Sequence, residues 1–484
     1  MRIKRVFDIL GPRGFVPNGI NWKNTDILWE HNFYITHDFI NRFNSTYTQN
    51  SVYDCNLNLP MEFLKDYHIS DLHYNESINK INNSDETYFY TIHPFGNVNI
   101  ATGVDISYHQ NVHCFDSISK KAIEYSKADN FYFIFDYSSE GDIQSNLFKT
   151  THDACKKNNI EPSKVIVITS SRNTFDIYKE YIKEETPSKL VYTSFYPWSL
   201  LAKSKDTNKI LFEDNVIEFN GNSNINTLMN IDEFDDLTNR DKKCLCLNRR
   251  LAPHRLIIIS YLINEKLFDD TMTSFDMKML HREDAGMDLV QGSGHNDAPY
   301  IKDQDFKNST MKGYHQMSKM KNNSLDYDDI NSVWGFGFES SDLYKKTYFS
   351  ITTETLFYEL GDYISEKTWK PIAHLHPFVF VGRPGILKYL KELGFKTFSD
   401  FWDESYDDID DNSDRMDSIL TVIKSLISKS TKEWDLMNIE LKPILEHNRN
   451  ILLSYQDTKV GNTYIKNLKK LISNEPNQEN HYLL

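Results

Sequence analysis

The sequence has no hydrophobic run long enough to cross a bilayer. The longest apolar run, around Leu256–Ile263, is about half of the ~20 residues that a membrane-spanning helix needs. The first residues contain no long apolar segment followed by a cleavage site, so we expect no secretory signal peptide there. Both absences predict a soluble, cytoplasmic protein without a membrane span.

Cysteine is scarce and follows no pattern. The five cysteines are scattered and odd in number, which predicts a reducing compartment and no disulfide framework. Cys244 and Cys246 alternate within an apparent strand, and no Cys or His pair at zinc spacing accompanies them. We therefore expect these two thiols to be small core residues.

Positive charge is in deficit. The 54 Lys and Arg residues are outnumbered by 69 Asp and Glu residues, which gives a net charge of -15. Nucleic-acid binding draws on clustered Lys and Arg, so this balance disfavours nucleic acid as a partner while leaving room for a local basic cleft.

The chain is longer than a single domain with one hydrophobic core usually is. With 484 residues, of which 39% are hydrophobic, the chain predicts two globular domains. The polar, acidic segment Ile231–Lys242 is the linker candidate. We place an N-terminal domain at residues 1–235 and a C-terminal domain at residues 236–484.

The N-terminal half alternates strands and helices. Phe131–Phe135 is an unbroken apolar run, typical of a parallel strand covered on both faces, and it is followed by Asp136 and Glu140. After a helical pattern come two further predicted strands, Lys164–Ile168 and Leu190–Tyr192, with another helix between them. This βαβαβ order predicts a Rossmann-like half with Phe131–Phe135 central in its sheet.

A second β/α series starts with the predicted strand Lys243–Leu247. It ends in an Asn-Arg-Arg turn, and a helix follows from about Pro253 to Ile263, with proline in its first turn. Residues 281–335 are polar with few periodic apolar residues and predict a long functional loop or insertion. Helices are predicted after the acidic segment Asp403–Asp414, forming the C-terminal end of an α/β chain.

The most informative stretch is Tyr348–Gly385. A β-rich run opens it and ends in the polar residues Thr352–Thr355, after which Asp362–Lys367 (DYISEK) opens a helix with Ser365 as N-cap. Pro371 limits the helix, and Pro377–Val381 reads as a buried strand. Polar residues at a strand's C-terminal end and at the next helix's N-terminus face a ligand crevice, for which a nucleotide phosphate is the natural guest.

Asp362–Lys367, followed by Pro377 to Gly382, resembles the donor-binding signature of the α1,3-fucosyltransferases. Thr353-Glu354-Thr355 keeps the acid of that family's Phe-Glu-Asn element. The chain is more similar to the soluble viral and bacterial members than to the animal Golgi enzymes. The resemblance implies a GT-B plan, in which two Rossmann-like domains face a cleft, the N-terminal domain binds the acceptor and the C-terminal domain binds the nucleotide sugar.

The resemblance also implies roles for the turn after Lys243–Leu247. In the family an Asn-rich turn is followed by an arginine at a helix start that reaches the pyrophosphate. Asn248 occupies the turn here, and Arg255 takes the pyrophosphate role, with Arg249 and Arg250 as further candidates. A guanidinium at a helix N-terminus suits a leaving diphosphate.

In the signature itself, four residues are implied to bind the donor, a GDP-sugar or UDP-sugar. Glu366 accepts from the ribose hydroxyls, Lys367 neutralises the diphosphate, Tyr363 packs on or near the base, and Glu354 is the retained acid. The donor is a substrate, and no separate cofactor is expected.

An inverting transferase needs a carboxylate to take the acceptor hydroxyl's proton. We expect it in the N-terminal domain at a strand end, with Glu140 as first choice and Asp136 as second; either could instead cap the following helix. Asp408 and Asp410 spell an Asp-x-Asp metal motif, but the stretch around them is so acidic that a solvated loop is the favoured interpretation, and no metal ligand is predicted.

Together with these residues, the resemblance implies an inverting, metal-independent glycosyltransferase that moves fucose or a related sugar from a nucleotide diphosphate to a glycan hydroxyl. Two alternatives stay open. One is sugar transfer to a modified nucleic-acid base. The other is an inactive structural or interaction protein that retains the GT-B fold.

Overall fold

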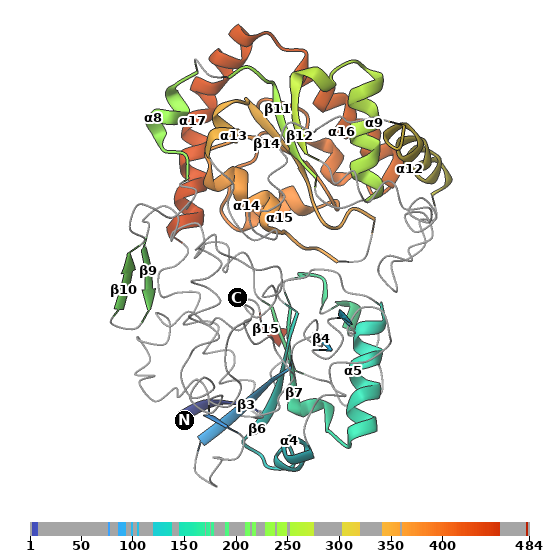
Figure 1. Cartoon of the computed structure of the whole chain (residues 1–484), viewed down its shortest axis with the longest axis vertical. Helices are drawn as coiled ribbons and strands as arrows, with labels where there is room; N and C mark the ends of the chain where they lie inside the picture. Colours follow the sequence, from blue (N-terminus) through green and yellow to red (C-terminus); the bar gives the residue numbers. More distant parts are fainter. Residues whose placement is uncertain are drawn as a thin grey trace. The chain divides into compact units, whose positions relative to one another are not determined.

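The protein has an α/β fold in the computed structural model (Figure 1). The structure describes residues 2–7, 76–77, 86–92, 98–99, 104–105, 120–137, 145–169, 171–174, 176–178, 189–192, 209–212, 215–218, 228–237, 240–248, 252–274, 303–319, 341–358, 361–454 and 481–482. Within these ranges, none of the helices combines the length and the apolar character that crossing a bilayer requires.

The first sheet is parallel throughout, and its strand order is β15-β8-β7-β6-β3-β1-β2. Its strands are β1 (Arg2–Phe7), β2 (Glu76–Ser77), β3 (Glu86–Ile92), β6 (Phe131–Tyr137), β7 (Val165–Thr169), β8 (Lys189–Tyr192) and β15 (His481–Tyr482). The accompanying helices are α4 (Lys120–Tyr125), α5 (Ser145–Asn158) and the 3-10 turn η5 (Pro162–Lys164). Two short antiparallel pairs are β4 (Val98–Asn99) with β5 (Val104–Asp105) and β9 (Lys209–Phe212) with β10 (Asn215–Glu218).

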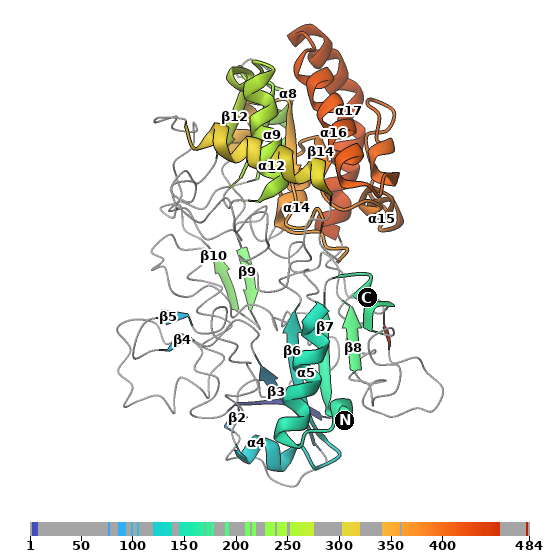
Figure 2. The same ribbon diagram turned by 90° about the vertical axis from the view of Figure 1, so that its right-hand side faces the viewer.

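Strand β6 lies in the middle of this sheet, which confirms the predicted central position. Phe131, Tyr132 and Phe133 are all buried, so successive side chains on both faces of the strand are covered. Helix α5 lies along one face of the sheet (Figures 1 and 2), and the rings of Phe148 and Tyr178 pack with centroids 4.5 Å apart. The strands predicted for β7 and β8 are confirmed.

The second sheet is also parallel, with the order β12-β11-β13-β14. Its strands are β11 (Cys244–Leu247), β12 (Thr271–Ser274), β13 (Phe349–Thr353) and β14 (Phe378–Val381). The chain leaves β11 for β12 on one side and returns to β13 on the other, so the winding direction reverses between β11 and β13. Cys244 and Cys246 are buried and free, as expected of core thiols.

Helices cover both faces of this second sheet. They are α8 (Ile231–Asp235), α9 (Pro253–Asn264), η6 (Phe268–Asp270), α12 (Gln304–Met317), α13 (Ser341–Lys345), α14 (Glu366–Ala373), α15 (Ile386–Glu392), η7 (Ser405–Asp408), α16 (Asn412–Ile427) and α17 (Thr431–Ser454). Helices α9, α12 and α16 pack together on one face, and α14 and α17 pack together on the other (Figures 1 and 2). Trp434 of α17 stacks on Phe349 of β13 with centroids 5.3 Å apart and so anchors this layer to the strand that carries the site.

The chain divides into two compact units. The first comprises Met1–Pro197, Asn208–Ile225 and Gln456–Leu484, and the second comprises Trp198–Thr207 and Asn226–Tyr455. The pairing of β15 with β8 returns the end of the chain to the first sheet. Sequence patterns cannot show this return, because a parallel partner is chosen by tertiary packing and not by the local sequence.

Three local predictions need correction. Residues 281–335 were expected to be a structureless functional loop or an insertion, but they contain α12. Asp303 is the N-cap of this helix, and its carboxylate accepts from the amides of Asp305 and Phe306. Strand β6 continues to Tyr137, so Asp136 lies within the strand and not after it. Helix α14 extends through Pro371 to Ala373.

Helix α12 approaches α9 so closely that Gly313 has no room for a side chain. A Cβ at Gly313 would lie 2.8 Å from the carbonyl oxygen of Leu256. We expect Gly313→Ala to lower the free energy of unfolding by about 1–3 kcal/mol, because backbone atoms must shift to admit the methyl group. Urea unfolding followed by tryptophan fluorescence measures this change.

The matched control is Ser309→Ala on the exposed side of the same helix, which should be neutral or slightly stabilising because alanine is the better helix former. A Gly313→Ala protein as stable as the control would contradict the close approach of the two helices.

Candidate functional site

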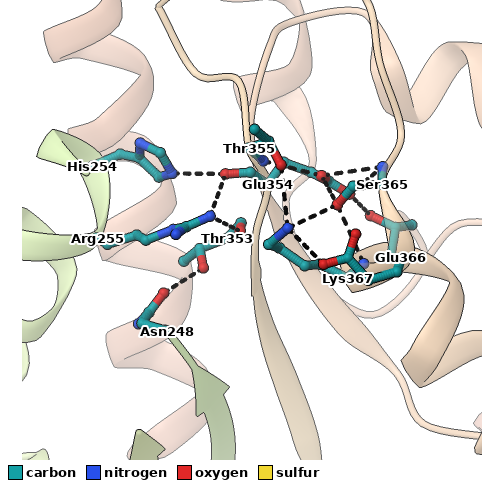
Figure 3. Close-up of polar contacts among 10 residues, drawn as sticks. Asn248, His254, Arg255, Thr353, Glu354, Thr355, Ser365, Glu366 and Lys367 are labelled. Atoms are coloured by element: carbon teal, nitrogen blue, oxygen red, sulfur yellow. Dashed lines mark hydrogen bonds and ion pairs between the residues drawn. The ribbon is translucent and has the colours of Figure 1, made fainter. Parts of the chain in front are cut away.

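The candidate site lies at the carboxyl end of the second sheet, where the winding reverses between β11 and β13. In open parallel sheets, ligands bind outside the carboxyl ends of the strands at such a switch point. The residues that follow β11 and β13, together with the N-termini of α9 and α14, meet at this edge (Figure 3). The structure therefore brings together Asn248, Arg255, Glu354, Glu366 and Lys367, which the sequence had placed in two separate motifs.

Asn248 connects the ends of β11, β12 and β13 through hydrogen bonds. Its side-chain oxygen accepts from the Thr353 hydroxyl at 2.5 Å, and its side-chain amide donates to the sulfur of Cys246 at 3.1 Å. Its backbone amide donates to the carbonyl of Ser274 at 3.1 Å. Asn248 is buried and held by β11, β12 and β13 at once, so its position supports the strand ends.

The carboxylate of Glu354 is fully buried and accepts from four protein donors. These are the hydroxyl of Ser365 at 2.5 Å, the hydroxyl of Thr368 at 2.6 Å, and the backbone amides of Thr355 and Ser365 at 3.1 and 3.2 Å. A carboxylate at a helix N-terminus is favoured by the helix dipole. Glu354 therefore joins the end of β13 to the start of α14.

Helix α14 begins as predicted, with Ser365 as its N-cap. The Ser365 hydroxyl accepts from the amide of Lys367 at 3.3 Å. The Lys367 ammonium group donates to the hydroxyls of Thr355 and Ser365, both at 3.2 Å, and pairs with Glu366 at 2.8 Å. About a quarter of the Lys367 side chain remains exposed (25%), so this cation borders solvent.

The ionised form of the Glu366 carboxyl group is favoured by its neighbours. Burial favours the neutral acid, but the ammonium groups of Lys367 and Lys370 outweigh burial and hold the pKa of Glu366 below its usual value. Only 13% of its side chain is exposed. An ionised acceptor beside a partly open cation can take both the hydroxyl groups and the anionic part of a ligand.

Arg255 and the preceding His254 come from the first turn of α9 and bind the backbone at the end of β13. The Arg255 guanidinium donates to the carbonyls of Thr353 and Glu354 at 3.4 and 3.3 Å, and the His254 Nε2 donates to the Glu354 carbonyl at 2.9 Å. Burial lowers the pKa of His254 well below its usual value, so the ring is neutral. Arg255 lies at the predicted edge, but its guanidinium turns to strand-end carbonyls.

Arg415, which the sequence analysis did not single out, supports the same edge from α16. Its guanidinium donates to the carbonyls of Phe357, Gly382 and Ile409 at 2.8, 3.2 and 2.9 Å and lies 4.3 Å from the centre of the Phe357 ring. Phe357 in turn stacks on His254 at 5.3 Å. The sequence did contain a signal for Arg415. It lies four residues before Ile419 and therefore on the inward-facing apolar side of a predicted helix, where a charged residue is unusual.

The remaining predicted residues are placed as follows. Tyr363 is buried in the segment before α14. Asp136 lies on β6, paired in register with Ile168 of β7. Arg249, Arg250 and Glu140 lie outside the described residues.

The acidic segment after β14 is less open than predicted. Asp408 and Asp410 are exposed, as expected of a solvated loop. Asp407 is buried, however, and its carboxylate accepts from the amides of Leu387 and Lys388 at 3.1 and 3.0 Å, which caps α15. Among the described residues no group of three or more His, Cys, Asp or Glu side chains could hold a metal ion.

We expect the protein to lose stability as the pH falls below about 6.5. Burial lowers the pKa of His376 to about 3 from an ordinary value of 6.5, and it lowers the pKa of His254 in the same direction. Above pH 6.5 both rings are neutral whether the chain is folded or unfolded, and they have no effect. Below it, only the unfolded chain takes up these protons, so each ring costs up to about 1.4 kcal/mol per pH unit.

Urea unfolding at several pH values between about 7.5 and 4 tests this expectation. His376→Gln should reduce the slope of stability against pH, whereas His315→Gln on the exposed side of α12 should leave it unchanged. A free energy of unfolding that stays constant as the pH falls through this window would refute the buried, neutral state of the two rings.

Comparison with known proteins identifies no family. No protein-family model and no curated protein sequence matches the chain. Among solved structures, the N-terminal domain of trehalose-6-phosphate phosphatase from Candida albicans is 8% identical, with 98% of this chain and 96% of that chain covered and a TM-score of 0.29. A similarity of that size supports no statement about shared fold or function.

Proposed function

We propose that the protein is a glycosyltransferase whose second unit binds a nucleotide diphosphate sugar. The observation that carries the proposal is the convergence of two helix N-termini and the cation Lys367 on the switch point of a parallel sheet. The resemblance of Asp362–Lys367 to the fucosyltransferase signature supports the same conclusion. The turn after β11 and the segment Asp362–Lys367 lie far apart in the sequence, and both lie at this edge of the sheet.

The geometry favours a diphosphate as the anionic part of the ligand. The helix dipole favours negative charge at a helix N-terminus. At α14 the amides of Ser365 and Lys367 already donate to Glu354 and to the Ser365 hydroxyl, so the Lys367 ammonium group is the cation proposed to meet a phosphate. Lys367 is held by hydroxyl groups at 3.2 Å and is partly exposed, so it can exchange its contact with Glu366 for a phosphate oxygen. Glu366, ionised beside it, is placed to accept from sugar or ribose hydroxyls.

The proposed reaction is inverting and follows the GT-B plan. The acceptor oxygen attacks the anomeric carbon, the bond from that carbon to the diphosphate breaks with its electron pair, and a carboxylate of the first unit takes the hydroxyl proton. In this proposal Lys367 stabilises the leaving diphosphate without a divalent ion. Glu140 and Asp136 remain the candidates for the base.

The proposed acceptor is a glycan hydroxyl, and the sugar is fucose or a related one. The net charge of -15 weakens the alternative of a nucleic-acid acceptor. Incubation with GDP-sugars and UDP-sugars and with free-sugar, glycan and DNA acceptors separates the two. The absence of transfer from a protein that binds the nucleotide would instead favour the inactive interaction protein.

We expect Lys367→Ala to weaken binding of a nucleoside diphosphate. The loss of one charge-assisted contact should cost about 1.5–3 kcal/mol of binding free energy. Isothermal titration calorimetry with GDP and with UDP measures the affinity of the two proteins.

The matched control is Lys432→Ala, which removes an exposed lysine from α17 and should bind like the unmodified protein. The proposal fails if the folded protein takes up neither GDP nor UDP. It also fails if Lys367→Ala binds as tightly as the control.

We expect Glu140→Gln to lower kcat by about 10²–10⁴-fold, because general base catalysis contributes that much. Donor affinity should stay unchanged, since the donor is proposed to bind the second unit. The assay follows release of nucleoside diphosphate in the presence of EDTA. Asp136→Asn is the companion variant: if it alone loses turnover, Asp136 is the base, and normal turnover by both variants would place the base elsewhere.

A further inference from the structure

Arg383 lies beside the candidate site at the end of the neighbouring strand. Strand β14 pairs with β13 in register, and the Glu354 amide donates to the Val381 carbonyl at 2.9 Å. Gly382 lets the ends of β13 and β14 approach each other closely. A Cβ at this position would lie 3.2 Å from the Cβ of Glu354 and 2.6 Å from the ring of Phe380. Arg383 therefore leaves the sheet at the same edge as Glu354, one strand away.

The guanidinium of Arg383 is weakly held. Its Nε lies 3.7 Å from the nearer carboxylate oxygen of Asp362, beyond hydrogen-bond distance, and this buried Nε has no hydrogen-bond partner. A quarter of the side chain is exposed (25%). A buried donor left without a partner is costly, which makes this guanidinium receptive to a ligand oxygen.

Arg415 provides the internal comparison. It is 1% exposed and donates to the carbonyls of Phe357, Gly382 and Ile409, so its donors are used within the protein. Burial lowers its pKa to about 10, and the nearby charge of Arg383 contributes to this shift. The charges of the two arginines interact, and of the two only Arg383 has a partly exposed side chain and an Nε without a hydrogen-bond partner.

The strand order places the end of β14, which Arg383 follows, beside the end of β13. Strands β11 and β14 flank β13, and neighbouring strands lie about 4.8 Å apart. Arg383 therefore follows the strand next to β13, and Lys367 lies in the first turn of α14, which Glu354 joins to the end of β13. Asp362, with 13% of its side chain exposed, lies in the segment before α14 and is the ion-pair partner of Arg383.

We propose that Arg383 is a specificity-determining residue that binds the phosphate distal to the nucleoside and exchanges Asp362 for it when the donor binds. The inference rests on the proposed function and adds to it: the site selects nucleoside diphosphates over monophosphates. Lys367 binds the part of the ligand common to both, and Arg383 binds the part that only the diphosphate has.

Calorimetry tests this with GDP and GMP, and with UDP and UMP. Arg383→Gln should weaken binding of the diphosphate that the unmodified protein prefers by at least about tenfold and leave the corresponding monophosphate within about twofold. Arg383→Lys keeps the charge and should recover part of the loss. Asp362→Asn should strengthen diphosphate binding, because it removes the competing carboxylate, and this gain should shrink when Arg383→Gln is also present.

The outcomes separate the inference from the function on which it rests. If the unmodified protein binds a diphosphate and Lys367→Ala weakens it, while Arg383→Gln has no effect or weakens both nucleotides equally, the role of Arg383 is overturned and the function stands. If no nucleotide binds the unmodified protein, both are overturned. A thermal unfolding curve for each variant identifies a loss caused by misfolding, in which case Arg383→Lys and Asp362→Asn decide.

Discussion

The candidate site depends on the buried carboxylate of Glu354. It comes at the end of β13 and binds the first turn of α14 through Ser365 and Thr368. Its backbone carbonyl accepts from His254, and its amide donates to Val381. One residue thus fixes a helix N-terminus, the first turn of a second helix and a neighbouring strand.

The physical chemistry explains why an acid suits this position. Taking an ionised carboxylate out of water costs several kcal/mol, and the cost is offset only when protein donors replace the lost water. Four donors and the positive end of α14 provide that replacement here. Because its oxygens are used in this way, Glu354 acts by positioning, and the proposed function assigns contact with the ligand to its partly exposed neighbours Lys367 and Glu366.

The main-chain carbonyl groups at the strand ends also need hydrogen-bond donors. Parallel strands leave carbonyl oxygens at their carboxyl edge, and Arg255 and Arg415 both donate to carbonyls there. Buried arginines that satisfy main-chain carbonyls fix irregular segments that have no secondary structure of their own. These hydrogen bonds hold the strand ends in place, as the proposed selection between nucleotides that differ by one phosphate requires.

The amino-acid sequence by itself determined several of the local elements. The apolar runs at β6, β7, β11 and β14, the proline in the first turn of α9 and the Ser365 cap were all predicted and are confirmed, because periodicity and capping act between residues close in the chain. Only the tertiary structure decided the strand order, the return of β15 to the first sheet, and the partners at the site. His254 and Glu354 are 100 residues apart, and Asn248 and Thr353 are 105 apart. Contacts over such separations follow from how the helices and strands pack, and no local pattern in the chain encodes them.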